Sequence, residues 1–185
     1  MADIHDETVA YAAGDTTCKG VLAVDRARSG KRPGVIVVHE WWGLNDYIRR
    51  RARMLAELGY VALAADIYGE GRTAATPAEA TQLMNGILGD IKAGEARFAA
   101  AYERIKAHPD CDPGRVAAIG YCFGGAMVLH QARIGTPLRG VVSFHGALGS
   151  FHKPAAGTVK AKVLVCHGAG DKLVPDADID AFKQE

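Results

Sequence analysis

The stretch Gly120–Gly125, Gly-Tyr-Cys-Phe-Gly-Gly, limits the possible folds of this chain more than any other part of it. The apolar run before it, residues 115–119, predicts a strand, and residues 126–130 after it predict the start of a helix. A strand that turns directly into a helix, with a glycine two positions before and after one reactive side chain, is typical of the nucleophile elbow, G-x-S-x-G. In this chain Cys122 occupies the nucleophile position in place of serine.

The glycines and the helix predict specific properties for this elbow. Gly120 and Gly124 are expected to be required because the turn brings backbone against backbone, while Cys122 takes a strained conformation that a neighbouring Cβ would obstruct. The helix N-terminus points at the sulfur and favours its thiolate form. The alternative is a buried cysteine that packs as a small apolar side chain in a glycine-rich turn. The order of strand, turn and helix favours the elbow.

Length and charge exclude several classes of protein. The chain of 185 residues predicts a single domain, residues 1–185, with room for a substantial core. A net charge of +1 gives no electrostatic reason to expect a nucleic-acid partner or an anionic membrane surface. The locally basic run Arg49–Arg53 is interpreted as a solvated helix face rather than a phosphate-binding patch.

Neither a targeting segment nor a metal motif is visible in the sequence. The N-terminal stretch is acidic and lacks the apolar core of a signal peptide. No window reaches the run of about 18 apolar residues that spans a bilayer. The four cysteines show neither C-x-x-C nor metal-type spacing, so we expect free thiols in a cytoplasmic protein that uses no metal or cofactor.

Short apolar runs alternate with helical patterns along the chain. Residues 8–25 predict an opening strand or hairpin, Asn45 is an expected N-cap, and Thr76–Glu79 is a capping box. A turn over Asp110–Gly114 is expected before the elbow strand. Further strands are predicted at 34–39, 60–65, 115–119, 140–145 and 161–167, and helices at 45–58, 76–89, 91–107, 126 onward and 175–185. This alternation predicts a mostly parallel sheet with helices on both faces.

Three loops at the carboxyl ends of predicted strands carry candidate catalytic groups, because reactive side chains gather at that edge of an α/β sheet. Besides Cys122, Asp171 follows the last strand and is the expected acid that orients a histidine, although it also suits a turn or N-cap. Glu40 follows the first buried strand, where it either opposes the thiolate, accepts the thiol proton or is a plain surface carboxylate. The backbone N–H groups of Phe123 and Trp41 are the expected oxyanion donors.

The sequence resembles the dienelactone hydrolase family, a branch of the α/β-hydrolase fold, from about residue 15 to residue 185. The resemblance rests on HEWWG from His39, ALAADIYG from Ala62, GYCFGG from Gly120 and HGAGDKLVP from His167. It implies a Cys-His-Asp triad that hydrolyses cyclic enol-lactones or related esters. It also implies that the glutamate of the first motif pairs with the cysteine while the site is empty and swings away when substrate binds.

Carried onto this chain, the family's roles fall on Cys122, Asp171 and Glu40. Members of the family continue into one more strand and a loop with the catalytic histidine, whereas this sequence stops at Glu185. We therefore expect a longer natural protein, and an α/β-hydrolase fold that lacks its last strand and helix within these residues.

None of the seven histidines stands where the family places its catalytic one. His39, His145 and His167 end predicted strands and are interpreted as structural. His152 lies in a loop and is the one stand-in to consider. The family binds the substrate carboxylate through arginines, and Arg72 is the candidate near the right loop, although no motif anchors it.

Together these features predict a hydrolase, a monomer by default, that cleaves a small lactone or carboxylic ester through a thioester on Cys122. One alternative is an amidotransferase-like fold with a cysteine elbow, but there a histidine usually follows the cysteine, and here Phe123 does. Another is a catalytically inactive binding protein that retains the fold, which the missing histidine supports. The identity of the ester stays open because loops 66–76 and 145–160 shape the pocket.

Overall fold

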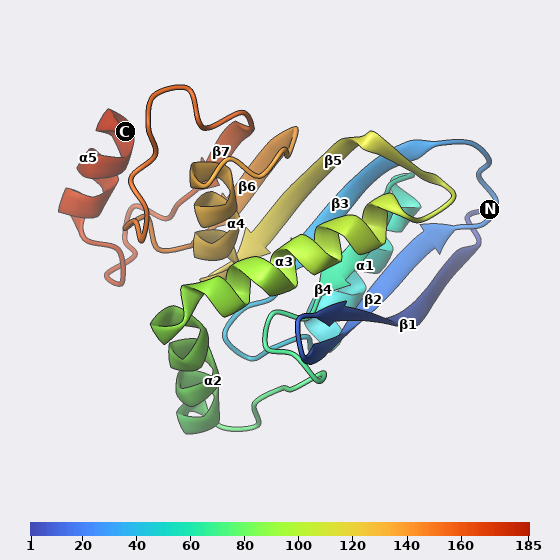
Figure 1. Ribbon diagram of the computed structural model, residues 1–185, viewed down its shortest axis with the longest axis horizontal. Coiled ribbons are helices and arrows are strands. Elements are labelled where there is room, and N and C mark those ends of the chain that lie inside the picture. Colours follow the sequence, from blue (N-terminus) through green and yellow to red (C-terminus); the bar gives the residue numbers. More distant parts are fainter.

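All strands of the protein join one sheet in the computed structural model, which describes all 185 residues (Figure 1). The strands are β1 (Ile4–Ala13), β2 (Thr16–Asp25), β3 (Arg32–Val38), β4 (Val61–Ala65), β5 (Cys111–Tyr121), β6 (Gly140–Phe144) and β7 (Lys162–Cys166). The helices are α1 (Asp46–Glu57), α2 (Pro77–Gly89), α3 (Ile91–Lys106), α4 (Phe123–Arg133) and α5 (Asp176–Gln184). The strand order is β1-β2-β4-β3-β5-β6-β7.

The sheet is parallel over most of its width, as the alternating sequence pattern predicts. Strands β4, β3, β5, β6 and β7 pair in parallel, and β1 and β2 form an antiparallel hairpin that joins the sheet through β2 and β4. The predicted opening hairpin is thereby confirmed. Because β5 lies between β3 and β6, the end of β5 is flanked by the ends of two parallel strands, and this arrangement positions the candidate site.

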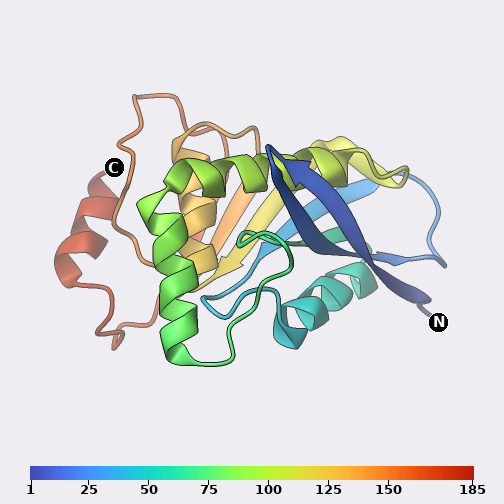
Figure 2. The ribbon, with the colours of Figure 1, turned by 60° about the horizontal axis from the view of Figure 1, so that its bottom comes forward.

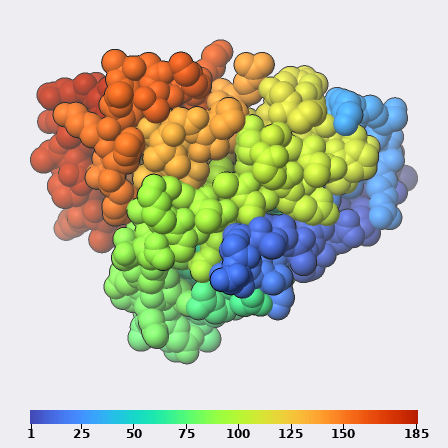
Figure 3. Space-filling view, in the orientation of Figure 1, coloured from blue at the N-terminus to red at the C-terminus, as the bar shows by residue number.

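Helices cover both faces of the sheet. α1 packs against β2 and β4 on one face, while α3 and α4 pack on the other, where the larger apolar cluster of 29 buried residues lies (Figure 2). α2 packs on α3 rather than on the sheet. On the face seen in Figure 3, the C-terminal segment (orange to red) lies at the upper left, α2 (green) at the lower left and the hairpin (blue) toward the lower right.

The predicted helix starts are confirmed, with one difference in the capping box. Asn45 accepts a hydrogen bond from the Ile48 N–H at 3.3 Å, and Thr76 accepts one from the Glu79 N–H at 3.3 Å. The Glu79 carboxylate accepts from the backbone N–H of Ala75 at 2.8 Å, instead of that of Thr76 itself. The chain therefore satisfies one further backbone donor outside the helix.

The turn predicted over Asp110–Gly114 lies only partly before the strand. Asp110 belongs to a turn in which the Cys111 N–H donates to the His108 carbonyl at 2.9 Å, whereas residues 111–114 lie inside β5. β5 already begins at Cys111, and its pairing with β3 jumps between Pro33 opposite Asp112 and Gly34 opposite Val116. Asp112 accepts a hydrogen bond from the Gly114 N–H at 2.9 Å across this irregularity. The turn residues thus form a bulge, which sequence cues for a turn do not distinguish from a strand boundary.

None of the five helices is long and apolar enough to cross a membrane.

Candidate active site

The candidate site lies where the ends of β3, β5, β6 and β7 meet at one edge of the sheet. Glu40 follows β3, Cys122 follows β5, His145 follows β6 and Asp171 belongs to the loop after β7. Since β3 and β6 are the two neighbours of β5, Cys122 stands between the loops that carry Glu40 and His145.

The elbow around Cys122 has the tight geometry predicted from its glycines. Cys122 has φ +53° and ψ −116°, a conformation that side chains with a Cβ rarely adopt, and its N–H donates to the Phe144 carbonyl at 2.9 Å. A Cβ on Gly120 would lie 2.0 Å from the carbonyl oxygen of Gly124, and one on Gly124 would lie 2.3 Å from that of Val38. The backbone crossing requires glycine at both positions, as predicted.

The pKa of the Cys122 thiol lies above its usual range. Burial raises its pKa, the nearby Phe123 N–H opposes this shift, and the carboxylates of Glu40 and Asp171 raise the pKa further. The N–H at the start of α4 favours the thiolate, as predicted, but burial has the larger effect on the pKa of Cys122. The thiol needs a proton acceptor before it can act as a nucleophile.

Glu40 does not pair with Cys122 in this structure, in contrast to what the family resemblance implies for an empty site. The pKa of Cys122 responds to Glu40 through charge, and no hydrogen bond joins the two side chains. Instead, Glu40 Oε1 lies 3.7 Å from His145 Nε2. His145, for which the sequence predicts a structural role, therefore lies beside a candidate catalytic residue. Its position at the end of the strand beside β5 is the signal that could have identified it, since the order of the strands decides which loops meet.

The backbone N–H of Trp41 has no hydrogen-bond partner within the chain. The Trp41 carbonyl accepts a hydrogen bond from the Tyr68 hydroxyl at 2.8 Å. Tyr68 is fully buried, and its pKa is raised by burial and by the charge of Cys122. Tyr68 thereby places the Trp41 loop close to Cys122. An N–H without a partner in the chain is available as an oxyanion donor, and this role of Trp41 stays a prediction.

His39 has the structural role predicted for it. It is completely buried, its Nε2 accepts from the Ile67 N–H at 3.3 Å, and its Nδ1 therefore carries the proton that it donates to the Glu40 carbonyl at 2.6 Å. Burial lowers its pKa, so the ring stays neutral. His39 ties the loop after β3 to the loop after β4.

Arg72 lies in a loop that contacts the Trp41–Gly43 segment, but its guanidinium bonds to its own loop. Its Nε donates to the Gly69 carbonyl at 3.2 Å, and a second nitrogen donates to the Tyr68 carbonyl. The Ala74 N–H donates to the Trp42 carbonyl at 3.0 Å. Arg72 therefore braces the loop beside the site, and its binding of a substrate carboxylate stays a prediction.

Asp171 is half-buried and fills the turn role that the sequence allows. Its Oδ1 accepts from the Leu173 N–H at 2.9 Å. Its charge also raises the pKa of Cys122, which places the carboxylate on the same side of the sheet edge. The second oxygen is left for another partner, so the turn role does not preclude a catalytic one.

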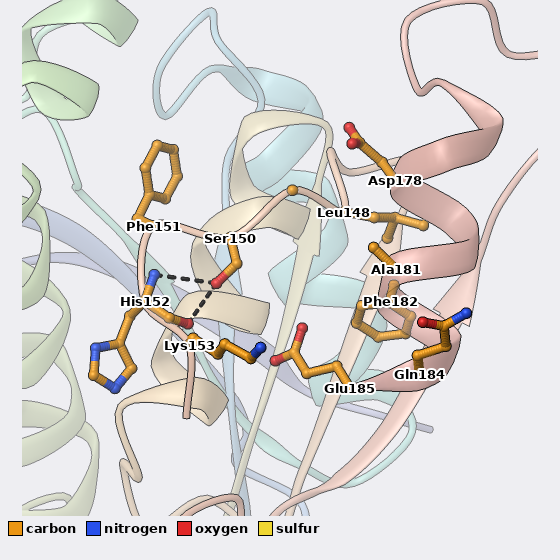
Figure 4. Close-up of a pocket in the computed structure, with 11 residues that line it drawn as sticks. Leu148, Ser150, Phe151, His152, Lys153, Asp178, Ala181, Phe182, Gln184 and Glu185 are labelled. Carbon is orange, nitrogen blue, oxygen red and sulfur yellow. Dashed lines mark hydrogen bonds between the residues drawn. The ribbon is translucent and has the colours of Figure 1, made fainter. Parts of the chain in front are cut away.

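A cavity of about 570 Å³ lies away from these groups, between residues 148–153 and α5 (Figure 4). His152 lines it, with a backbone N–H that donates to Ser150 Oγ at 3.1 Å. None of the six residues predicted for the site lines this cavity. The structure therefore gives no support to His152 as a stand-in for the catalytic histidine. No group of three or more His, Cys, Asp or Glu side chains forms a metal-binding cluster.

A mostly parallel sheet that carries a cysteine elbow at the end of β5, with helices on both faces, defines an α/β-hydrolase fold. A family profile gives the more specific assignment. The chain belongs to the dienelactone hydrolase family, whose profile matches residues 19–185.

Known proteins place the chain within this family in more detail. A solved structure described as m3DLH is 42% identical, with a TM-score of 0.91, over 98% of this chain and 75% of its own. A dienelactone hydrolase-like promiscuous phosphotriesterase, P91, from metagenomic libraries is 41% identical, with a TM-score of 0.89 and the same coverage. A protein of Methylorubrum extorquens named "Putative carboxymethylenebutenolidase" is 28% identical over 89% of this chain. This chain spans 61% of that relative's length.

Proposed function

We propose that the protein hydrolyses a lactone or carboxylic ester through a thioester on Cys122. Membership of a hydrolase family gives the general class of activity and implies a small-molecule substrate. The observation that carries the proposal is the strained Cys122 elbow with the unpaired Trp41 N–H in the adjoining loop. A cysteine that only fills space needs neither a positive φ nor a free donor nearby.

The proposed reaction has two halves. The sulfur of Cys122 attacks the ester carbonyl carbon, and the bond to the leaving oxygen breaks to form a thioester. The proton that the thiol gives up passes to the leaving oxygen. Water then attacks the thioester carbon, the C–S bond breaks, and the acid and the thiol are restored. In each half the N–H groups of Phe123 and Trp41 stabilise the charge that develops on the carbonyl oxygen.

Asp171 has the role of the acid that orients a histidine in this proposal. Activation of water would fall to the histidine that the family resemblance implies, and none of the seven histidines here matches its position. The carboxylate would fix the histidine's tautomer and stabilise its protonated form. Glu40 is proposed to tune the ionisation of Cys122.

Asp171→Asn tests this assignment without disturbing the turn. Asparagine keeps an oxygen that accepts from the Leu173 N–H, so the fold is retained while the negative charge is lost. We expect kcat/KM for a p-nitrophenyl ester to fall by roughly 10²–10⁴-fold. Asp180→Asn, an exposed carboxylate of α5, is the matched control and should keep wild-type activity. Equal activity of the two variants would remove Asp171 from the catalytic machinery.

Phosphotriester hydrolysis is a second candidate activity. It rests on the identity of 41% to the protein described as a promiscuous phosphotriesterase, which exceeds the 28% to the carboxymethylenebutenolidase relative. A cysteine thiolate beside backbone donors suits attack at phosphorus as well as at a carbonyl carbon. Release of nitrophenol from a p-nitrophenyl phosphotriester and from a p-nitrophenyl ester, compared on one preparation, decides which substrate class has the larger kcat/KM.

A further inference from the structure

The contact between Glu40 and His145 passes over the end of the strand that carries Cys122. Glu40 follows β3 and His145 follows β6, and these strands lie on opposite sides of β5. Their side chains nevertheless meet, with Oε1 and Nε2 3.7 Å apart. Two loops that flank the nucleophile are therefore connected by one carboxylate–imidazole pair.

The backbone at His145 indicates that this side chain is held there for a reason other than packing. Its φ is +44°, and besides Cys122 only Glu70 shares a positive φ among the residues other than glycine. The His145 side chain is 48% exposed, so little apolar burial offsets the strain. Glycine or asparagine would suit such a turn better.

The neighbours of His145 fix the direction of the turn. The His145 N–H donates to the Cys166 carbonyl at 2.9 Å. At the next residue, Gly146, a Cβ would lie 2.7 Å from the Ala126 N and 2.6 Å from Ser143 Oγ. The turn after β6 is thus packed against the start of α4, and this packing fixes the backbone that carries the imidazole.

The position of the Glu40 carboxylate matters because its charge raises the pKa of Cys122. A carboxylate in direct contact with the thiol would oppose ionisation more strongly than one that has turned toward an imidazole. The other charged or titratable groups around the pair are Asp171 and Tyr121. The charge of Asp171 raises the pKa of Cys122, and the charge of Glu40 raises that of Tyr121, whose ring lies under the Arg51 guanidinium. Among the basic side chains, only His145 lies within 4 Å of the Glu40 carboxylate.

We propose that His145 is a positioning residue that holds the Glu40 carboxylate out of contact with Cys122 and thereby sets how readily the thiol ionises. The inference rests on the proposed function, in which Cys122 is the nucleophile. The pair is too exposed to matter for folding, since surface ion pairs contribute little to stability. We expect the pair to affect the pH at which the Cys122 thiol ionises.

The test is the rate of alkylation of Cys122 by iodoacetamide as a function of pH, read from the peptide that contains it. His145→Asn keeps a side chain that tolerates the positive φ but is too short to reach Glu40. Glu40 is then free to turn toward the thiol. We expect the midpoint of the rate profile to move up, and the rate at pH 7 to fall by roughly three- to tenfold, because one pKa unit changes the thiolate fraction tenfold.

A double-mutant comparison separates positioning from a direct charge effect of the imidazole. In a Glu40→Gln background, His145→Asn should change the Cys122 rate less than twofold, because no carboxylate remains to be positioned. His152→Asn in the exposed loop, and the rate at Cys166 in the same digests, should match the wild type. An unchanged rate in His145→Asn, or an equal decrease with and without Glu40, would overturn the proposal.

Failure of this inference is distinguishable from failure of the proposed function. Alkylation reports the ionisation of Cys122 without any turnover. If His145 and Glu40 prove not to be coupled, the thioester mechanism is therefore unaffected. Ester hydrolysis that persists without Cys122 contradicts the mechanism whatever the alkylation profile shows.

Discussion

Cys122→Ala is expected to lower kcat for ester hydrolysis by ~10³-fold or more, because removal of a nucleophile leaves only the contribution of binding and of the oxyanion donors. The variant should fold normally, since alanine fits the space of the thiol and the glycines that form the elbow are untouched. Release of p-nitrophenol from a p-nitrophenyl ester measures the loss, and thermal unfolding of the same preparation verifies the fold.

Cys166→Ala is the matched control for this substitution. Cys166 is an exposed free thiol at the end of β7, two strands away from β5, and has no role in the proposed reaction. It should retain wild-type kcat and KM. Full activity in Cys122→Ala, or an equal loss in both variants, would show that the hydrolysis does not depend on the elbow cysteine.

Gly120→Ala is expected to lower the free energy of unfolding by ~3 kcal/mol or more, a large share of the stability of a typical domain. The added Cβ would lie 2.0 Å from the carbonyl oxygen and 2.2 Å from the carbonyl carbon of Gly124. Both atoms belong to the backbone, so β5 and α4 would have to separate. The midpoint of urea unfolding, monitored by circular dichroism, measures the effect.

Gly86→Ala gives the opposite expectation from the same chemical change. Gly86 lies within α2, where an added Cβ meets nothing within 4 Å. Alanine in a helix interior stabilises by ~0.5–1 kcal/mol relative to glycine, so the unfolding midpoint should rise. If Gly120→Ala and Gly86→Ala unfold at the same denaturant concentration, the close crossing at the elbow does not occur.

Much of the fold could be predicted from local patterns, because the strands are apolar runs and the helices carry clear caps at Asn45 and Thr76. The order of the strands could not be predicted in this way. The sequence of β2 does not predict that β2 pairs with β4, because long-range packing determines that pairing. The bulge in β5 could not be predicted for a related reason. The residues Asp112–Gly114 favour a turn whether or not the flanking segments stay paired.

The elbow could be predicted from the sequence because its chemistry is local: the strand, the glycines, the cysteine and the helix follow one another directly. Interactions between loops were harder to predict. The pairing of Glu40 with His145 joins residues more than a hundred positions apart, and it depends on β3 and β6 being the two neighbours of β5. The effect of burial on the pKa of Cys122 could not be predicted either, because burial is a property of the packed structure and not of the motif.

The most direct test of the central claim is the mass of the protein within the first turnovers of a p-nitrophenyl acetate reaction quenched in acid. The thioester mechanism predicts that a fraction of the protein gains the mass of one acetyl group, that peptide mapping places this group on Cys122, and that it disappears as the substrate is consumed. Nitrophenol release with no acetylated protein at any time, or an acetyl group on a residue other than Cys122, would contradict it.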